Sequence, residues 1–336
     1  MPHLLVDISS HGYGHVSQTS AVVNELVRLM PELRVTVRTT APHEFLQQRF
    51  QCNFKHIPAA YRAFHADWRQ KVAREAQALR DLKPDLLLAN VPYLSLAAAH
   101  AAGVRAAGMC SLNWADIYRH YCADDVASKS IYGQMLEAYL NAEYFLKVQP
   151  AMDMPEFSNA RSIAPIARTG QPQRSNIAKQ CALHEGQKLV MVAMGGMEFR
   201  LPVQSWPHLP GVRWIVPQAW HIRRADTVAF ESLHLSFSDV LASCDAIITK
   251  PGYGIFTEAA CAGVPVLYVA RRDWPEEPCL VQWLTQNAAC MEVERETLQT
   301  GELGEVLQQL WLLPMPPRPD ASGAVEAAEF LRAKFF

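Results

Sequence analysis

Residues 245–269 read Asp-Ala-Ile-Ile-Thr-Lys-Pro-Gly-Tyr-Gly-Ile-Phe-Thr-Glu-Ala-Ala-Cys-Ala-Gly-Val-Pro-Val-Leu-Tyr-Val. An apolar strand at 246–248 runs into a Pro-Gly-Tyr-Gly turn. A helix is expected from Ile255 to Ala262, and Gly263 ends it before a second apolar strand at 264–269. This order predicts a βαβ unit of an α/β protein, with a glycine-bearing loop at the start of its helix.

The loop at Gly252, Tyr253 and Gly254 suits a phosphate or pyrophosphate. Backbone N–H groups at a helix start lack intrahelical partners, and the helix dipole is positive there. Glycines also let the backbone approach a ligand closely. Glu258 lies about one helical turn past Gly254, where a carboxylate accepts hydrogen bonds from ribose hydroxyls. The alternative is a tight turn that holds no ligand, because glycine loops are common in such folds.

A second glycine loop occurs near the N-terminus of the chain. A strand at 3–9 is followed by the turn Ser-His-Gly-Tyr-Gly-His at 10–15 and by helical periodicity at 16–30. This loop is not the dinucleotide fingerprint, because Ser17 stands at the third glycine position. A third apolar strand, 188–194, ends in the pair Gly195 and Gly196. Separate βα starts near residues 3 and 188 predict two doubly wound, Rossmann-like domains that face a central cleft.

Composition restricts the class of protein. The 336 residues are 50% hydrophobic and 19% charged, which is typical of a globular chain long enough for two domains. A formal net charge of −2 without a basic run argues against nucleic-acid binding. No segment approaches the about 20 apolar residues of a membrane span, and no charged leader precedes the first strand. We therefore expect a cytoplasmic protein without an integral membrane segment.

Cysteine usage gives a consistent expectation. The eight cysteines are scattered without a Cys-x-x-Cys pair, and most stand in apolar segments. This pattern favours buried thiols in a reducing compartment over disulfides. No Cys/His set has zinc-ligand spacing, so we expect no metal site.

Strand and helix signals alternate through the first 150 residues, which predicts a parallel sheet covered on both faces. Residues 151–175 break this alternation with prolines and little periodicity. We therefore expect an N-terminal acceptor-side domain at 1–160 and a C-terminal donor domain at 161–316. An amphipathic helix within 317–336 is expected to cross back to the first domain.

Four motifs together resemble a known family. They are Ser-Ser-His-Gly-Tyr-Gly-His at 9–15, Asn-Trp at 113–114, Lys-Pro-Gly-Tyr-Gly-Ile-Phe-Thr-Glu at 250–258 and Arg-Arg-Asp-Trp-Pro-Glu-Glu-Pro at 271–278. The chain resembles GT-B glycosyltransferases from Leu4 to Leu303. It is most similar to the glycosyltransferase-like N-terminal region of plant L-arabinokinases and its stand-alone bacterial relatives. The chain contains no kinase phosphate loop, so we do not expect arabinokinase activity.

The resemblance implies a donor site in the second domain. It assigns binding of the donor nucleotide, typically UDP in such enzymes, to Gly195, Gly196, Val216, Lys250, Gly252, Tyr253, Gly254, Thr257, Glu258, Arg271 and Arg272. Val216 belongs to the stretch 214–218, where relatives hold the base through backbone contacts. Glu276 and Glu277 fall where many relatives carry an acid–glutamine pair that contacts donor sugar hydroxyls. The second position here is glutamate, which departs from that pair. For Arg271 and Arg272 the alternative to phosphate binding is surface salt bridging.

The resemblance also implies an acceptor site in the first domain. His15 corresponds to the general base of many relatives, and the chemistry suits a histidine because its pKa lies near working pH. The alternatives are that His15 caps the helix or donates to phosphate, and neighbouring His11 is a second candidate base. Asp116 is a candidate to orient the histidine. Asn113 and Trp114 are expected to line the acceptor side, with core packing as the alternative for Trp114.

The predicted function is a GT-B glycosyltransferase of the hexosyl- or pentosyltransferase class. It would move a sugar from a nucleotide diphosphate donor to an unidentified acceptor nucleophile. No Asp-x-Asp motif occurs in the sequence, so we expect a metal-independent reaction without a cofactor. A nucleotide-sugar epimerase or hydrolase of the same fold, and a non-catalytic sugar-nucleotide-binding protein, are the alternatives.

Overall fold

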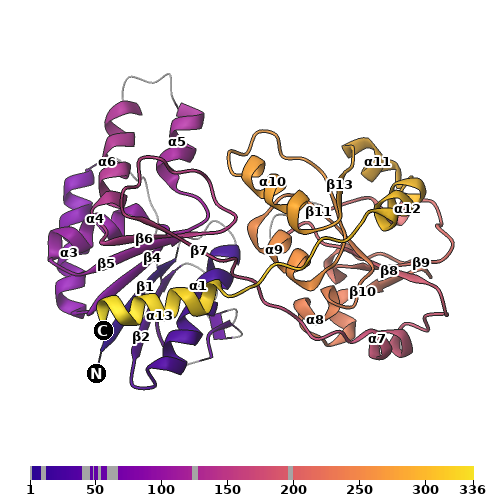
Figure 1. The fold of residues 1–336 in the computed structure, drawn as a ribbon, viewed down its shortest axis with the longest axis horizontal. Helices are drawn as coiled ribbons and strands as arrows, with labels where there is room; N and C mark the ends of the chain where they lie inside the picture. Colours follow the sequence, from indigo (N-terminus) through magenta and orange to yellow (C-terminus); the bar gives the residue numbers. More distant parts are fainter. Residues whose placement is uncertain are drawn as a thin grey trace. The chain divides into compact units, whose positions relative to one another are not determined.

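The chain folds into two compact units (Figure 1). The computed structural model describes residues 2–8, 13–39, 46–47, 49–51, 54–58, 67–122, 128–195 and 200–336. One unit comprises Met1–Ile166 together with Ser322–Phe336, and the other comprises Ala167–Ala321. Each unit has its own parallel sheet.

The first unit is built on a seven-stranded sheet in the order β3-β2-β1-β4-β5-β6-β7. All of its described strand pairs are parallel. The strands are β1 (His3–Ile8), β2 (Arg34–Thr39), β3 (Phe54–Pro58), β4 (Leu86–Asn90), β5 (Ala106–Cys110), β6 (Tyr144–Val148) and β7 (Ala160–Ile163). Every residue of β1, β4 and β5 is buried, because helices cover both faces of a parallel sheet.

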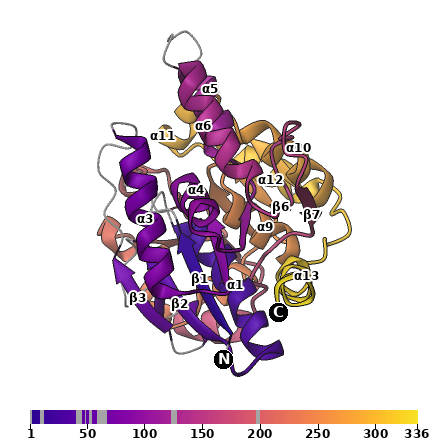
Figure 2. The ribbon, with the colours of Figure 1, turned by 90° about the vertical axis from the view of Figure 1, so that its left-hand side faces the viewer.

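Helices flank this sheet on both sides (Figures 1 and 2). They are α1 (Tyr13–Leu29), α3 (Trp68–Leu82), α4 (Tyr93–Ala102), α5 (Trp114–Cys122), α6 (Ser128–Leu140) and α13 (Gly323–Phe335). Helices α1 and α13 pack together, while α3, α4 and α6 form the opposite layer. The strand order reverses direction between β1 and β4, and right-handed crossovers therefore place the helices on two faces.

The last helix of the chain belongs to the first unit. The Phe330 ring lies edge-on to Tyr144, with 4.8 Å between the centroids, and the Arg161 guanidinium stacks over it at 4.5 Å. Arg105 donates to the carbonyl of Phe335 at 3.2 Å, which satisfies a free acceptor at the helix C-terminus. These contacts join residues far apart in sequence into one core.

The second unit has a six-stranded parallel sheet in the order β10-β9-β8-β11-β12-β13. The strands are β8 (Lys188–Val192), β9 (Val212–Val216), β10 (Thr227–Ala229), β11 (Ala246–Thr249), β12 (Val266–Tyr268) and β13 (Cys290–Glu292). The helices are α7 (Arg174–Gln180), α8 (Phe237–Leu241), α9 (Tyr253–Ala262), α10 (Glu277–Asn287), α11 (Arg295–Thr300) and α12 (Gly304–Leu312), with 3-10 turns η1 (Val203–Ser205), η2 (Gln218–Trp220) and η3 (Phe230–Leu233). One core cluster centres on Trp206 and Trp214, whose rings lie edge to face at 5.2 Å.

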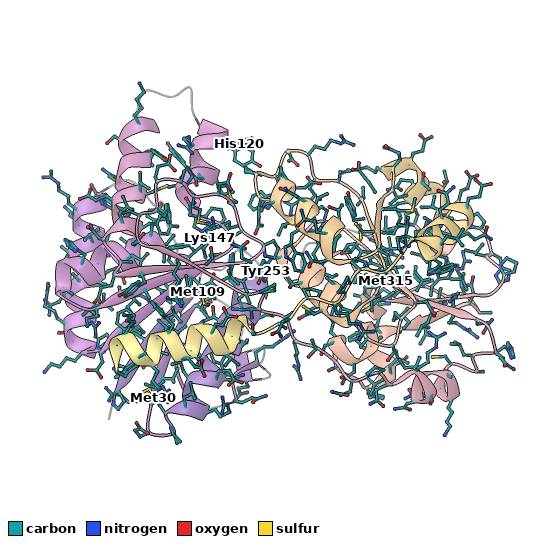
Figure 3. The ribbon with its side chains drawn as sticks, in the orientation of Figure 1. Met30, Met109, His120, Lys147, Tyr253 and Met315 are labelled. Atoms are coloured by element: carbon teal, nitrogen blue, oxygen red, sulfur yellow. The ribbon has the colours of Figure 1, made fainter. Side chains whose placement is uncertain are left out.

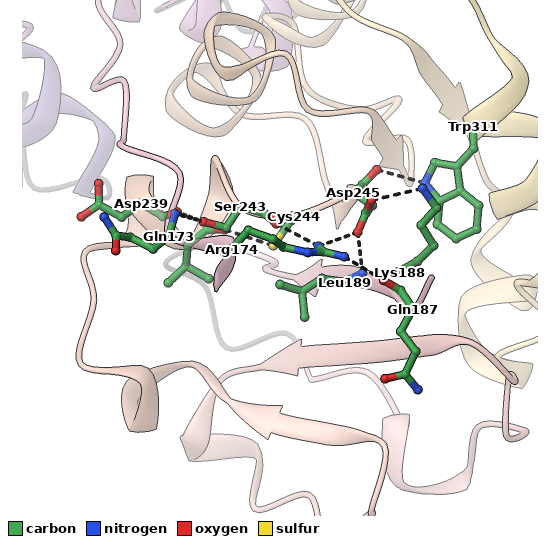
Figure 4. A network of polar contacts seen from close by, with 11 residues as sticks. Gln173, Arg174, Gln187, Lys188, Leu189, Asp239, Ser243, Cys244, Asp245 and Trp311 are labelled. Carbon is green, nitrogen blue, oxygen red and sulfur yellow. Dashed lines mark hydrogen bonds and ion pairs between the residues drawn. The ribbon is translucent and has the colours of Figure 1, made fainter. Parts of the chain in front are cut away.

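A polar network closes the N-terminal edge of this second sheet (Figure 4). Asp245, just before β11, pairs with Arg174 at 2.6 Å and Lys188 at 3.2 Å and accepts from the backbone N–H of Leu189 at 2.7 Å. The indole of Trp311 donates to the carbonyl of Asp245 at 2.9 Å. One aspartate therefore ties α7, β8 and α12 to the start of β11.

No helix in the described ranges has the length and apolar character needed to span a membrane.

Candidate functional site

In both sheets the candidate residues follow the carboxyl ends of strands. His15 lies on α1 after β1, and Asn90 ends β4. Gly195 follows β8, while Lys250 and Gly252 follow β11. Ligands of open parallel sheets bind at this edge, where the strand order reverses. The sequence therefore places its polar residues where this fold binds ligands.

His15 has a defined partner in the first unit. Its Nδ1 lies 2.8 Å from Oδ1 of Asn90, a residue that is 0% exposed. The Asn90 Nδ2 donates to Oε1 of Gln18 at 3.1 Å, and the Cys110 thiol lies 3.6 Å from the same histidine nitrogen. His15 is half-buried, and its imidazole contacts the Asn90 amide at the end of β4 and the Cys110 thiol at the end of β5.

Asp116 lies in a different environment from the one expected. Its carboxylate accepts from Asn113 Nδ2 at 2.7 Å and from Arg119 at 2.9 Å. Oδ1 of Asn90 accepts a hydrogen bond from Nδ1 of His15, so Asn90 and not Asp116 is in position to orient the histidine. The sequence reasoning did not single out Asn90. The sequence feature that could have identified Asn90 is its position as the polar residue that ends an otherwise apolar strand.

Asn113 has a structural role at the start of α5. Its Oδ1 accepts from the backbone N–H of Asp116 at 2.8 Å, and the side chain is fully buried. This is a helix N-cap interaction, so the polar atoms of Asn113 are engaged inside the protein. Trp114 is half-buried, and its backbone N–H donates to the hydroxyl of Tyr139 at 3.2 Å. Of the two predicted acceptor residues, Trp114 retains exposed side-chain surface.

Two predicted residues, His11 and Gly196, lie outside the described residues.

In the second unit, helix α9 begins with the glycine loop. Gly252 is its N-cap and offers no side chain, and Tyr253 is its first residue (Figure 3). The Thr257 hydroxyl donates to the carbonyls of Tyr253 and Gly254 at 2.9 and 3.1 Å. Thr257 is fully buried, and its hydroxyl is bound to carbonyls in the first turn of the helix. Glu258 is half-buried one turn along. No side chain in the described part of this helix start caps its N–H groups, which suits an anionic ligand.

Two cationic side chains accompany this helix start. Burial and the nearby Arg271 guanidinium hold the pKa of Lys250 below its usual value. Gly195 has a φ of 72°, and a Cβ there would lie 3.5 Å from Cε of Lys250, so the loop after β8 runs beside the lysine stem. Within the described ranges no carboxylate forms an ion pair with either Lys250 or Arg271. Two neighbouring cations that form no ion pair favour the binding of an anion.

The two arginines of the Arg-Arg pair differ in their surroundings. Arg272 pairs with Glu292 at 2.6 Å and its side chain is 78% exposed. Arg272 therefore forms a surface salt bridge, which is the alternative to phosphate binding. Arg271 stacks instead over the Trp274 ring at 5.0 Å, which orients its guanidinium. The sequence predicted the same two alternatives, phosphate binding or surface salt bridging, for both arginines.

Glu276 and Glu277 are both buried, with 5% and 7% of their surface exposed. Oε2 of Glu276 accepts from the indole N–H of Trp274 at 3.1 Å. Oε1 of Glu277 accepts from the backbone N–H of Arg271 at 2.8 Å, while its Oε2 is buried without a partner. A buried carboxylate oxygen without a donor is costly, and a ligand hydroxyl would satisfy it. Trp274 is a residue of this site that sequence reasoning missed.

Val216, the residue predicted near the base, borders a pocket of about 320 Å³. The pocket is lined by Val216, Pro217, Gln218, His221, Ile222, Arg223, Arg224, Thr227 and Ala229. Its volume falls in the lower range of small-molecule sites. Two arginines, Arg223 and Arg224, line the pocket. Arg224 forms an ion pair with Asp226 at 2.7 Å, which neutralises its charge.

Among the residues described, no cluster of three or more His, Cys, Asp or Glu side chains has the geometry to hold a metal ion.

Similarity to known proteins supports the fold. No protein-family model matches this chain. An L-arabinokinase of Arabidopsis thaliana is 22% identical over 347 residues, which cover 96% of this chain and 33% of the relative. The chain thus spans about a third of the length of the curated relative it matches.

Solved structures share the fold of this chain over nearly its whole length. CalG4, the calicheamicin glycosyltransferase, superposes with a TM-score of 0.63 at 17% identity, covering 99% of this chain and 94% of the other. A UDP-glucosyltransferase from Polygonum tinctorium gives 0.62 at 13% identity, covering 99% and 98%. A UDP-N-acetylglucosamine 2-epimerase gives 0.59 at 14% identity, covering 99% and 96%. The α/β fold of two Rossmann-like units, GT-B, is therefore confirmed.

Proposed function

We propose that this protein is a glycosyltransferase that moves a sugar from a nucleotide diphosphate donor to an acceptor nucleophile. One observation carries the proposal. The α9 start, with Gly252 as a side-chain-free cap, lies in a region that also holds Lys250 and Arg271, whose cations form no ion pair in the described chain. A diphosphate would accept hydrogen bonds from the helix N–H groups and pair with both cations.

The second unit would bind the donor. Helix N–H groups and the two cations would neutralise the diphosphate as it departs, so no metal ion or cofactor is part of the proposal. Glu258 would accept hydrogen bonds from ribose hydroxyls. Glu277 would accept one from a sugar hydroxyl through its unpartnered Oε2. Solved structures of this fold include proteins that use UDP-sugars, which supports a UDP-sugar donor.

The first unit would supply the base. His15 would take the acceptor proton as the nucleophile attacks the sugar, because an imidazole titrates near neutral pH. Trp114 would contribute apolar surface on the acceptor side. A cytoplasmic location, where nucleotide sugars and reduced thiols coexist, belongs to the same proposal.

A nucleotide-sugar epimerase or hydrolase is the second candidate. Two observations favour it: a UDP-N-acetylglucosamine 2-epimerase shares the fold, and two buried glutamates stand together at 276 and 277. A carboxylate pair can serve acid–base chemistry without an acceptor.

Nuclear magnetic resonance of the purified protein with a panel of nucleotide sugars separates the candidates. Sugar consumption that requires an added acceptor, from a cell extract or a panel of hydroxyl compounds, supports transfer. Consumption or isomerisation without acceptor supports the second candidate. Line broadening of the nucleotide sugar without turnover, in the presence of such acceptors, contradicts both.

The variant His15→Ala tests the base within the leading proposal. Turnover should fall by roughly 10²–10⁴-fold while donor affinity stays intact, because general-base catalysis contributes about that factor. Loss of donor affinity together with turnover would instead indicate that His15 donates to the diphosphate. Near-normal turnover would exclude His15 as the base and make His11 the candidate to test.

A further inference from the structure

We propose that Asn90 is a positioning residue that holds His15 in the tautomer with its proton on Nδ1 and its basic lone pair on Nε2. The geometry that carries this inference is the 2.8 Å contact between Nδ1 of His15 and Oδ1 of Asn90. The catalytic consequence rests on the proposed function. The tautomer itself can be measured without any reaction.

The hydrogen-bond network indicates how the amide of Asn90 is oriented. Its Nδ2 donates to Oε1 of Gln18 at 3.1 Å, so its Oδ1 faces the imidazole. A carbonyl oxygen only accepts hydrogen bonds, so the histidine nitrogen beside it must carry the proton. In a neutral ring the lone pair then resides on Nε2, the nitrogen that would receive a proton. Flipping both amides together would reverse this assignment, which makes the tautomer the decisive observable.

The partners of the imidazole are held firmly. Asn90 and Cys110 are fully buried at the ends of adjacent strands β4 and β5, and Gln18 is 3% exposed on α1. The backbone of His15 is tied within α1, since the Thr19 hydroxyl donates to its carbonyl at 2.7 Å. Close-packed interiors leave such side chains little freedom. Asn90 therefore constrains ring rotation as well as proton position.

Asn90 differs from an acidic partner in one respect: it carries no charge. A carboxylate at the same place would stabilise the imidazolium and raise the pKa of the ring. Among the described residues of the neighbouring strands, the Cys110 thiol lies 3.6 Å from Nδ1 of His15. The other ionisable groups on the elements packed against α1 are His3 and Asp7 on β1 and Glu326, Glu329, Arg332 and Lys334 on α13. Of these, Asp7 is already paired with Arg38 at 2.5 Å.

The first experiment uses the native protein. Nitrogen-15 chemical shifts of the imidazoles distinguish the two neutral tautomers, and the variant His15→Gln identifies the His15 resonances by their loss. We expect the neutral ring of His15 to carry its proton on Nδ1. A ring protonated on Nε2 would overturn the proposal, whatever reaction the protein catalyses.

The second experiment changes the partner. In Asn90→Asp the pKa of the His15 ring should rise by about one unit or more, because a carboxylate replaces a neutral amide at the same distance. The matched control is Asn24→Asp, the same substitution on α1 about 13 Å further along the helix axis. Asn24 donates to the carbonyl of Arg49 and lies nine residues beyond His15, so its replacement should leave the His15 titration unchanged. Equal titration in both variants would contradict the proposal. If Asn90→Asp does not fold, the tautomer of the native protein decides.

Kinetics then connect the pair to turnover. If His15 is the base, the acid limb of the pH–kcat/KM profile should move in Asn90→Asp by the same amount and direction as the ring pKa. A purely structural role for Asn90 would lower the melting temperature and leave that limb in place, which would overturn the catalytic part. If His15 has the expected tautomer but the protein transfers no sugar, the positioning role of Asn90 is supported and the proposed function is refuted.

Discussion

The backbone N–H of Arg271 donates to Oε1 of Glu277 at 2.8 Å, while Oε2 of the same carboxylate is buried without a partner. One oxygen of Glu277 therefore organises the loop that carries Arg271. The other oxygen is an acceptor that the described chain does not satisfy. Since unsatisfied buried acceptors are rare in native structures, we interpret this oxygen as directed to a ligand hydroxyl.

Replacing Glu277 by Gln separates sugar recognition from diphosphate recognition. The variant keeps an oxygen for the Arg271 N–H and exchanges the unpartnered acceptor for an amide donor. Affinity for the nucleotide sugar should fall by about 10- to 100-fold, as expected for loss of a hydrogen bond to a charged group. Affinity for the nucleoside diphosphate, which lacks the sugar, should not change. Calorimetry with both ligands measures this split, and Glu296→Gln on exposed α11 is the matched control.

Lys250→Met should weaken anion binding without destabilising the protein. The fold holds the pKa of Lys250 below its usual value, through burial first and Arg271 second, so the native state disfavours the charged form. Removing that charge should leave the melting temperature unchanged or higher. Pyrophosphate should raise the melting temperature of the native protein and have a much smaller effect on the variant.

The pH dependence of pyrophosphate binding follows from the same lysine. The ammonium is charged below its pKa, so its contribution to binding is present at low pH and disappears as the pH rises through that pKa. Because the pKa is depressed, the loss should begin at lower pH than for an exposed lysine. Lys179→Met, on the surface helix α7, should retain the native profile. A profile in Lys250→Met identical to that of the native protein would exclude Lys250 from the anion site.

Phe330→Ala should destabilise the first unit by about 3–5 kcal/mol, because it removes a buried aromatic ring and leaves a cavity. The ring packs on Tyr144 and carries the Arg161 guanidinium on its face. Val325→Ala on the same helix, at a side chain that is 37% exposed, should cost far less. Denaturant unfolding followed by fluorescence tests the pair. Equal effects would mean that α13 does not stabilise the unit through this face.

Asp245→Ala should destabilise the second unit by about 1–3 kcal/mol. The substitution leaves the backbone N–H of Leu189 without its acceptor and separates Arg174 from its carboxylate. Glu292→Ala, which breaks the exposed pair with Arg272, provides the comparison and should cost about 1 kcal/mol or less. Thermal unfolding measures both variants. A larger loss of stability in Asp245→Ala than in Glu292→Ala would show that the Asp245 network stabilises the packing of α7 and β8.

Several site residues were predictable because their signals are local. Lys250 and Gly252 stand directly between an apolar strand and a helix, and Glu276 and Glu277 are the N-cap and the first residue of α10. Other residues stand in recognisable motifs, but the motif does not reveal their partners. Trp274 was indistinguishable from a core residue until the structure showed its indole beside Glu276 and its ring beneath Arg271. Asp116 follows Asn113 at a spacing that fits a helix cap, and the structure shows that cap.

The sequence by itself determined the two βα frameworks of this protein. Alternating apolar strands, glycine loops and helical periodicity are short-range patterns, and each depends on the conformations of neighbouring residues. Strand order and side-chain partnership depend instead on how distant segments pack. His15 and Asn90 are separated by 75 positions, and they meet because β4 pairs directly with β1 in the sheet. Only the tertiary structure could therefore show that the neutral amide of Asn90 contacts the histidine, while the carboxylate of Asp116 is bound by Asn113 and Arg119.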